Sequence, residues 1–269
     1  MIIATAIDGK SYSIDTSTGI DLSIPYNFNG KQPNFYDVEE GKLSSLKAAG
    51  NSWSVSEGAS CNVPEISMNI HCSGTHTESV GHLLEDLGDI GALLIQPFIS
   101  AVVITVEPEV YLNSPDSYHC SVNKNERVIS ADMISMKYKN FLKSAPDALI
   151  IRTKPNHPIK RFMQYSHHPP PFLTNNAMST ICQTEVKHLI VDTPSVDRMS
   201  DDGILGNHHI FWGDGLNPKS KVNPKSEKTI TELAYIPNSV EDGFYFLNIQ
   251  IPHFVCDAAP SRPLLYRVI

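Results

Sequence analysis

The sequence predicts a mixed α/β fold, in which buried strands alternate with helices. Residues 99–107 and 148–153 are nearly continuous runs of branched apolar side chains, a pattern typical of strands buried on both faces of a sheet. The run 189–191 indicates a third strand of this kind. Between the first two strands, apolar residues recur at helical spacing from Ser130, a candidate N-cap, to about Leu142.

The remaining elements follow weaker signals. Thr174 is a candidate cap of a second helix that ends near Glu185, and two C-terminal strands are expected at 244–252 and 264–268. Residues 26–63 are rich in Asn, Pro, Gly and Ser, which predicts mostly loop. Long irregular segments are often functional, for example as a flap over a site.

Composition limits the classes of partner. The chain has 269 residues, of which 41% are hydrophobic and 19% charged, as in an ordinary soluble globular protein. Its formal net charge is -8 and it has no basic block. These charges argue against binding to nucleic acid and against electrostatic docking to an anionic membrane. A small molecule is the expected partner.

The cysteine pattern and the N-terminal residues bear on the compartment. The five cysteines are odd in number and widely spaced, unlike the disulfide framework of a small secreted protein. Residues 1–9 have no positively charged segment followed by a long apolar run, so no signal peptide is expected. No apolar window approaches the length of a membrane-spanning helix. We therefore expect a cytoplasmic protein.

One stretch concentrates side chains that bind metals or move protons. Within residues 72–82 these are Cys72, His76, Glu78 and His82. The run 66–77 is rich in β-branched residues and interrupted by a glycine, which predicts extended chain. Because side chains alternate faces along a strand, Cys72, His76 and Glu78 would share one face. A thiolate, an imidazole and a carboxylate together indicate a divalent metal site, with zinc as the first candidate.

Two other interpretations of this stretch stay open. It is also consistent with a polar strand whose His76 and Glu78 are solvated and whose Cys72 belongs to the core. Alternatively, Cys72 acts as a nucleophile paired with His76 or His82. Iodoacetamide would inactivate such an enzyme, whereas a chelator would not.

The stretch resembles the signature of the metal-dependent cyclase family, which includes bacterial kynurenine formamidases and isatin hydrolases. The family pattern is His-x-Gly-Thr-His-x-Asp-x-Pro-x-His. The matching residues are Gly74, Thr75, His76 and His82, and the departures are Cys72 for the first His, Glu78 for Asp and Val80 for Pro. His71 is one residue out of register and would point to the opposite face of a strand. Cys72 is therefore the preferred candidate for the first ligand.

Further elements carry the resemblance in the family's order. They are 20–25 with Asp-Leu-Ser, 148–153 ending in Arg-Thr, 192–197 reading Asp-Thr-Pro-Ser-Val-Asp, 208–215 ending in Gly-Asp-Gly, and 257–262 reading Asp-Ala-Ala-Pro-Ser-Arg. The resemblance therefore runs from about Asp21 to the C-terminus.

The resemblance implies two metal ions, usually zinc and less often manganese, bridged by the carboxylate of the motif. Carried over to this sequence, the ligands of one ion are Cys72, His76 and Glu78, and those of the other are Glu78, His208 and Glu232. His209 and Glu227 remain as alternatives to His208 and Glu232. Asp192 and Asp197 are candidates to orient ligand histidines, or simply to form turns.

The implied activity is hydrolysis of a C–N bond in an N-formyl or cyclic amide. A bound Zn²⁺ lowers the pKa of its water to ~7 and polarises the carbonyl. His82, with an ordinary pKa of ~6.5, would be the general acid/base. The alternative is a family member with an altered metal site that acts as a binding or structural protein. Cysteine in place of histidine favours zinc and makes a single-zinc centre a second arrangement to consider.

The resemblance also implies the architecture and the assembly. The family has a swivelling β/β/α domain with a central barrel-like mixed sheet and a few peripheral helices, and it forms homodimers or larger oligomers. We expect residues 1–269 to form one such domain. Residues 2–15 read as an antiparallel hairpin around the turn pair Asp8-Gly9, so residues 1–17 would be an N-terminal addition.

Overall fold

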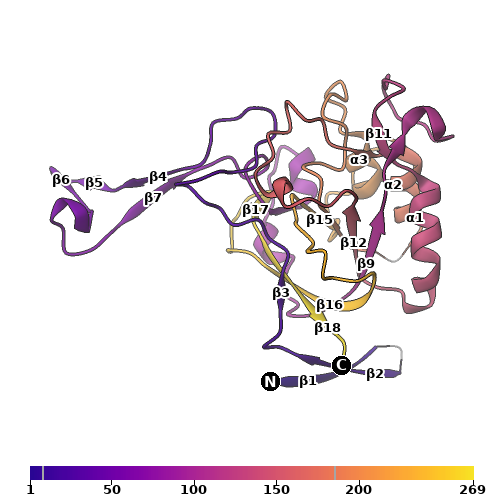
Figure 1. Ribbon diagram of the computed structural model, residues 1–269, viewed down its shortest axis with the longest axis horizontal. Coiled ribbons are helices and arrows are strands. Elements are labelled where there is room, and N and C mark those ends of the chain that lie inside the picture. The colour runs from indigo at the N-terminus through magenta and orange to yellow at the C-terminus, as the bar shows by residue number, and fades with distance from the viewer. Residues whose placement is uncertain (8, 185) are drawn as a thin grey trace.

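A nine-stranded mixed sheet forms the centre of the computed structural model, which describes residues 1–7, 9–184 and 186–269 (Figure 1). In spatial order its strands are β17 (Ala258–Pro260), β8 (His76–Glu78), β15 (Thr229–Glu232), β14 (His188–Val191), β12 (Ala148–Thr153), β9 (Ile99–Val106), β16 (Gly243–Gln250), β18 (Arg262–Arg267) and β3 (Ile20–Asp21). The four consecutive strands β15, β14, β12 and β9 are parallel, and the outer pairs are antiparallel. The predicted strands at 99–107, 148–153 and 189–191 are confirmed.

The central strands are buried on both faces, as their unbroken apolar sequences predict. On β9, Val102 and Ile104 point into one apolar cluster, and the alternate residues Ala101 and Val103 point into another. The first cluster lies between the sheet and the helices. The second includes residues of β9, β12, β14, β16 and β18, so the sheet curls around it. This arrangement confirms the predicted mixed α/β fold with a barrel-like sheet.

Three α-helices among the described residues cover one face of this sheet: α1 (Ala131–Tyr138), α2 (Asn175–Cys182) and α3 (Gly206–Trp212) (Figure 1). Thr174 caps α2 as predicted, because its hydroxyl accepts a hydrogen bond from the Ala177 N–H at 3.0 Å. That helix ends at Cys182, before the predicted end near Glu185, a residue outside the described ranges. None of the helices in those ranges has both the length and the apolar composition that crossing a bilayer requires.

Helix α1 differs from its prediction in two respects. It ends at Tyr138 and continues as a 3₁₀ segment, so the α-helical part is shorter than expected. Ser130 precedes the helix but its side chain caps nothing and donates to Glu109 instead. The first helical N–H, that of Ala131, donates to Asp116 at 2.7 Å, so a carboxylate from a distant loop satisfies the helix start.

Short elements complete the body. A small sheet contains β10 (Glu109–Val110), β11 (Arg127–Ile129) and β13 (Phe172–Leu173). The 3₁₀ segments are η1 (Val55–Glu57), η2 (Val80–Leu83), η3 (Ile90–Ala92), η4 (Tyr111–Asn113), η5 (Lys139–Ser144) and η6 (Pro158–Phe162).

The predicted N-terminal hairpin is confirmed as β1 (Ile2–Ile7) and β2 (Lys10–Asp15), although Asp8 of its turn lies outside the described residues. Ile14 of β2 is buried against Phe246 and Tyr266, so the hairpin packs on the strands at the edge of the main sheet. Whether the whole chain behaves as one domain stays a prediction.

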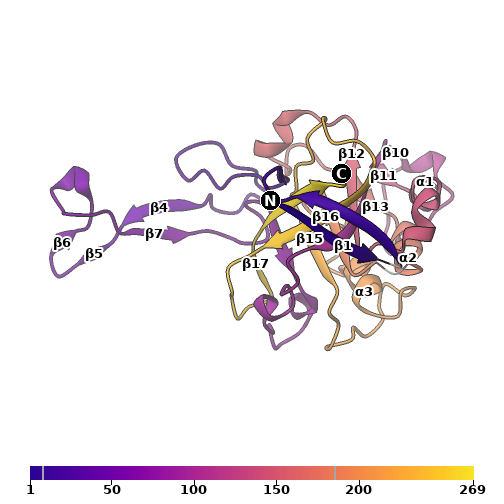
Figure 2. The same ribbon diagram turned by 90° about the horizontal axis from the view of Figure 1, so that it is seen from below.

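A long hairpin arm, residues 42–67, extends away from the body in both views (Figures 1 and 2). Its base is formed by the antiparallel strands β4 (Lys42–Ser45) and β7 (Pro64–Ser67), and its outer part by β5 (Lys47–Ala48) and β6 (Asn51–Ser52). The prediction of mostly loop for 26–63 missed this hairpin, because its strands are short and polar and alternate only weakly.

Candidate metal centre

Two neighbouring strands bring together three of the candidate ligands. His76 and Glu78 are two residues apart on β8 and therefore share one face. The antiparallel pairing of β8 with β15 sets Glu232 opposite His76. His76 Nε2 lies 3.6 Å from Glu232 Oε2. All three residues are buried, with 0%, 1% and 4% of their surface exposed.

Helix α3 supplies the fourth candidate ligand, His208. Its Nε2 lies 3.0 Å from Glu78 Oε1 and 3.7 Å from Glu232 Oε1. Its Nδ1 forms a 2.7 Å hydrogen bond with Asp197 Oδ2, which fixes the ring with Nε2 directed at the carboxylates. The adjacent His209 instead has Nδ1 2.8 Å from the Ser220 carbonyl, outside this cluster.

The two other sequence alternatives lie elsewhere. Glu227 is exposed and belongs to none of the metal-capable groups of the described chain. Asp192 accepts hydrogen bonds from Thr153 and Lys160, so it does not orient a ligand histidine. Asp197 is the carboxylate that does so.

His82 and Asp257 form the rim of the cluster. His82 lies on η2, and its Nε2 is 3.9 Å from Glu78 Oε2. Its Nδ1 forms a 3.2 Å hydrogen bond with Asp257 Oδ2. The imidazole is 26% exposed, whereas Glu78 beside it is buried, so His82 stands between the centre and solvent.

His71 joins the centre, against the expectation drawn from strand geometry. Its Nδ1 lies 3.1 Å from Glu78 Oε2, and its Nε2 is 3.0 Å from the same Asp257 oxygen that binds His82. The prediction of extended chain over 66–77 is wrong, because β7 ends at Ser67 and β8 begins at His76. The Asn69 side chain accepts the Cys72 N–H at 3.0 Å, which closes a turn between the two strands.

Because residues 68–75 are not a strand, Cys72 does not share the face of His76 and Glu78 that alternation along a strand predicted. It packs in an apolar cluster with Ile24, Phe35, Tyr165 and Leu233, and it belongs to none of the metal-capable groups among the described residues. Burial, followed by the negative charge of Glu232, raises the pKa of the Cys72 thiol to about 11.

Opposite charges stabilise one another inside the cluster. Burial alone would raise the pKa of Glu78, but the neighbouring imidazoles of His82 and His208, with hydrogen bonds from His208 and His71, hold it well below its usual range. Burial lowers the pKa of His208, yet Glu78 and Asp197 raise it well above normal. For His71 the effect of burial is likewise outweighed by hydrogen bonds to Asp257 and Glu78, which raise its pKa to about 10.

The donor atoms fit a divalent cation. His76 Nε2 is buried without a hydrogen-bond partner in the described part of the chain, which is uncommon for a polar atom in an interior. Glu78 Oε2 faces two imidazoles, with His71 Nδ1 at 3.1 Å and His82 Nε2 at 3.9 Å. Glu232 Oε2 lies 3.6 Å from His76 Nε2 and Glu232 Oε1 lies 3.7 Å from His208 Nε2, and both distances are longer than a hydrogen bond. Two ligands that each lie about 2.1 Å from a tetrahedral ion are about 3.4 Å apart, close to these values. Imidazole and carboxylate are ligands that zinc accepts.

Sequence reasoning missed one residue near the centre. Tyr36, from the segment that was expected to form a flap, is half-exposed and has a left-handed backbone with φ 66°. Its hydroxyl donates a 2.9 Å hydrogen bond to the Met199 carbonyl, and burial, followed by the negative charge of Asp201, raises its pKa to about 12. Only the positive φ distinguishes this residue, and the sequence does not reveal it.

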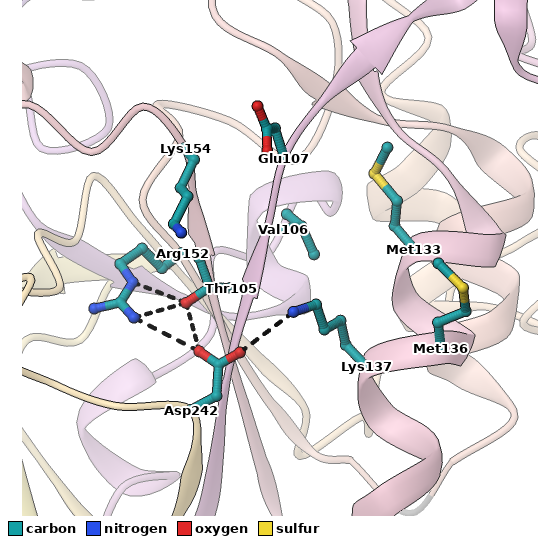
Figure 3. A pocket seen from close by; sticks show the side chains of 9 residues that line it. All are labelled: Thr105, Val106, Glu107, Met133, Met136, Lys137, Arg152, Lys154 and Asp242. Carbon is teal, nitrogen blue, oxygen red and sulfur yellow. Dashed lines mark hydrogen bonds and ion pairs between the residues drawn. The ribbon is translucent and has the colours of Figure 1, made fainter.

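A large cavity lies away from this centre, beside α1 (Figure 3). It has a volume of about 510 Å³ and is lined by Thr105, Val106, Glu107, Met133, Met136, Lys137, Arg152, Lys154 and Asp242. Its floor is an ion-pair network, in which Asp242 contacts Arg152 at 3.6 Å and Lys137 at 3.7 Å. None of these residues belongs to a metal-capable group.

The fold and the centre define a mixed α/β protein with a buried metal-capable site of histidines and carboxylates. Residues 20–198 match a family model described as "Putative cyclase". The chain belongs to this cyclase family. The resemblance noted from the sequence is therefore confirmed at the level of family and fold.

Relatives with known names are similar over most of the chain. A kynurenine formamidase of Bacillus cereus (strain ATCC 14579) is 26% identical over 202 residues, which cover 73% of this chain and 78% of the relative. A kynurenine formamidase of Bacillus mycoides (strain KBAB4) has the same identity and coverage.

Solved structures share the fold at low sequence identity. Isatin hydrolase A from Labrenzia aggregata superimposes with a TM-score of 0.60 at 12% identity, covering 93% of both chains. A chain described as a potential metal-dependent hydrolase with cyclase activity gives 0.57 at 16% identity, covering 93% of this chain and 98% of the other. The named relatives are hydrolases, which supports the prediction of an enzyme.

Proposed function

We propose that the protein is a metal-dependent hydrolase that cleaves a C–N bond of an N-formyl or cyclic amide. The observation that carries the proposal is the convergence of four imidazoles with Glu78, Glu232 and Asp257, together with the buried Nε2 of His76, which has no hydrogen-bond partner within the described ranges. The relatives named kynurenine formamidase and isatin hydrolase support the choice of substrate class.

The proposed ligands differ from the sequence-based set at one position. In this proposal one group of ligands is His71, His76 and Glu78, whose ligand atoms lie within 4.8 Å of one another. The second is Glu78 and His208 with Glu232, which belongs to no such compact group of described residues but lies 3.7 Å from His208 and 3.6 Å from His76. A divalent cation there supplies Lewis acidity, which acidifies water and polarises an amide carbonyl. Zinc is the proposed cation and manganese the less favoured one, as one ion or two, because the set is rich in imidazole.

In this mechanism His82 moves the proton. Its Nε2 faces Glu78, and it is open to solvent on one side. A neutral His82 accepts the proton of the attacking water and becomes an imidazolium, which then donates the proton to the leaving nitrogen. Asp257 holds His82 through Nδ1 and stabilises the imidazolium with its negative charge.

The direct test is hydrolysis of formylkynurenine and of isatin by the purified protein. Activity should disappear with a chelator and return with added zinc. We expect His82→Asn to lower kcat by about 10²–10⁴-fold, the usual contribution of general acid/base catalysis. His253→Asn is the matched control, since His253 also pairs with a carboxylate, Asp89, but on the exposed surface.

Two results would contradict the proposal. A protein that is purified without metal and takes up neither zinc nor manganese would instead be the binding or structural protein that the altered motif also suggests. Unchanged turnover in His82→Asn would remove the proton carrier, and the mechanism with it.

We further propose that the protein is a homo-oligomer, whose second copy covers the arm. The supporting observation is that the arm extends away from the body (Figure 2) and carries large apolar side chains that are exposed. These are Leu43, Trp53, Val55, Val63 and Ile66. Exposed apolar surface of this extent is typical of protein contacts.

Light scattering after size-exclusion chromatography tests this assembly. The wild type should run as a dimer or larger species, and Leu43→Asp combined with Ile66→Asp should shift it to the monomer. Leu112→Asp, an exposed leucine on the body, is the control and should not change the mass. A monomeric wild type at tens of micromolar chain would overturn the proposal.

A further inference from the structure

A second cluster of ligand-type side chains lies behind the candidate centre. It consists of His119, Asp197 and Asp201, whose ligand atoms lie within 4.8 Å of one another. The His119 imidazole is 1% exposed and the Asp201 carboxylate 5%. Asp197 is 1% exposed. Both carboxylates come from the segment that joins β14 to α3, and His119 comes from the loop between β10 and β11.

The His119 ring is held with one nitrogen directed at the two carboxylates. The ring packs against Tyr118, with 4.1 Å between centroids and the planes tilted by 36°. It also lies so close to Gly206 that a Cβ there would be 2.2 Å from Nδ1. Nδ1 faces the Asn175 amide, with Oδ1 at 3.3 Å, to which it can donate, and Nδ2 at 3.2 Å. Nε2 is buried without any hydrogen-bond partner. A histidine that binds a metal commonly donates its other N–H to an oxygen in this way.

Each carboxylate faces one imidazole, since Asp197 Oδ2 lies 2.7 Å from His208 Nδ1 and Asp201 Oδ2 lies 3.6 Å from His119 Nε2. Asp201 accepts hydrogen bonds from the backbone N–H groups of Gly203 and Leu205, at 3.0 and 2.6 Å. Asp197 accepts from the Tyr118 hydroxyl at 2.8 Å and from the Asn207 N–H at 2.9 Å. These hydroxyl and amide donors are neutral, so among the described residues the two imidazoles are the contacts of these carboxylates that can carry positive charge. Two buried carboxylates so close together repel each other, and a divalent cation between them would offset that repulsion.

We propose that His119, Asp197 and Asp201 bind a divalent cation, distinct from the cation or cations of the candidate centre. The 3.6 Å from His119 Nε2 to Asp201 Oδ2 is too long for a hydrogen bond and near the ~3.4 Å between two ligands of one tetrahedral ion. One imidazole and two carboxylates suit Zn²⁺ or Mn²⁺, with water completing the coordination.

The cation would fix the loop that positions His208. Asp197 contacts His208 Nδ1 on one side and the proposed site on the other. The ion would also tie the His119 loop to the segment that begins α3. We therefore infer a structural cation, whose loss lowers the melting temperature as well as the number of bound ions.

The test counts cations per chain without using activity. Wild type, Asp201→Asn and His119→Gln are stripped with a chelator, reloaded with ZnCl₂ or MnCl₂, and dialysed, and the metal is measured by mass spectrometry. Both variants should bind one cation fewer than wild type and melt at lower temperature. The matched control is Asp202→Asn, because Asp202 is an exposed neighbour of Asp201 with a left-handed backbone that asparagine tolerates.

If both His119→Gln and Asp201→Asn keep the wild-type number of cations, the inference is wrong. That result would indicate that the His119 imidazole itself balances the charge of Asp201. Glu232→Gln separates this site from the proposed function. If only Glu232→Gln loses cations, the candidate centre stands and the second site fails. If only the His119 and Asp201 variants lose them, the second site stands and the candidate centre fails.

Discussion

The shared carboxylate of Asp257 offers a sharp test of the proposed mechanism. Its Oδ2 contacts His82 Nδ1 at 3.2 Å and His71 Nε2 at 3.0 Å, and the side chain is 12% exposed. Asp257→Asn keeps the shape of the side chain and its ability to accept one hydrogen bond but removes the negative charge. The hydrogen bonds and charge of the two imidazoles hold the pKa of Asp257 well below its usual range, against the opposing effect of burial.

The expected size of the effect follows from the contact to His82. A hydrogen bond that involves a charged group contributes about 1.5–3 kcal/mol, and ~1.4 kcal/mol corresponds to a tenfold change in rate. The negative charge of Asp257 stabilises His82 most when His82 is an imidazolium, that is, after it has accepted the proton. Asp257→Asn should therefore lower kcat by about 10- to 150-fold while KM changes little.

The assay is steady-state hydrolysis of formylkynurenine with the cation content measured on the same sample. The cation content separates a weaker proton carrier from a lost ligand, because Asp257 also contacts His71. Asp89→Asn, which removes the exposed partner of His253, should leave kcat within twofold. A kcat for Asp257→Asn within twofold of wild type, at full cation content, would refute the role of Asp257 in orienting His82.

Three further outcomes are expected. Burial lowers the pKa of His188 to about 4 from 6.5, so between these pH values the unfolded chain binds more protons than the folded one. The contribution of His188 to the free energy of unfolding should therefore fall by about 3 kcal/mol from pH 7 to pH 4. Urea titrations at several pH values should show this contribution in the wild type and its loss in His188→Gln. Ile104→Ala, at a fully buried position, should lower the free energy of unfolding by about 2–5 kcal/mol, whereas the exposed Ile95→Ala should change it by less than about 0.5 kcal/mol. His208→Gln should reduce the cation content of the purified protein, and His209→Gln should not, as measured by mass spectrometry.

The parts of the fold that could be predicted are those whose signal is local. Strands β9 and β12 are unbroken apolar runs because both of their faces are buried, and this pattern is visible in any short window. The arm strands β4 and β7 carry no such signal, because their side chains face solvent on both sides. Their pairing depends on the hairpin connection between them rather than on composition.

The candidate site likewise divides into residues placed by a local pattern and residues placed by tertiary contacts. His76 and Glu78 share a face because β8 is a real strand, so period-two reasoning placed this pair correctly. The same reasoning failed at Cys72, because the Asn69 side chain closes a turn before β8, and the alternation of residue types does not predict that turn. Asp257 was part of the family resemblance, but its contact with a residue 175 positions away depends on tertiary packing.

The departures from the family motif at positions 72 and 78 are geometrically related. Glutamate in place of aspartate extends the carboxylate by about 1.5 Å. In the structure the two oxygens of Glu78 reach opposite sides, with Oε1 3.0 Å from His208 and Oε2 3.1 Å from His71. A cysteine at the first ligand position withdraws into the apolar cluster, and the histidine one residue earlier supplies an imidazole to the longer carboxylate. The longer carboxylate of Glu78 therefore contacts imidazoles through both oxygens, and one of them belongs to the residue just before Cys72.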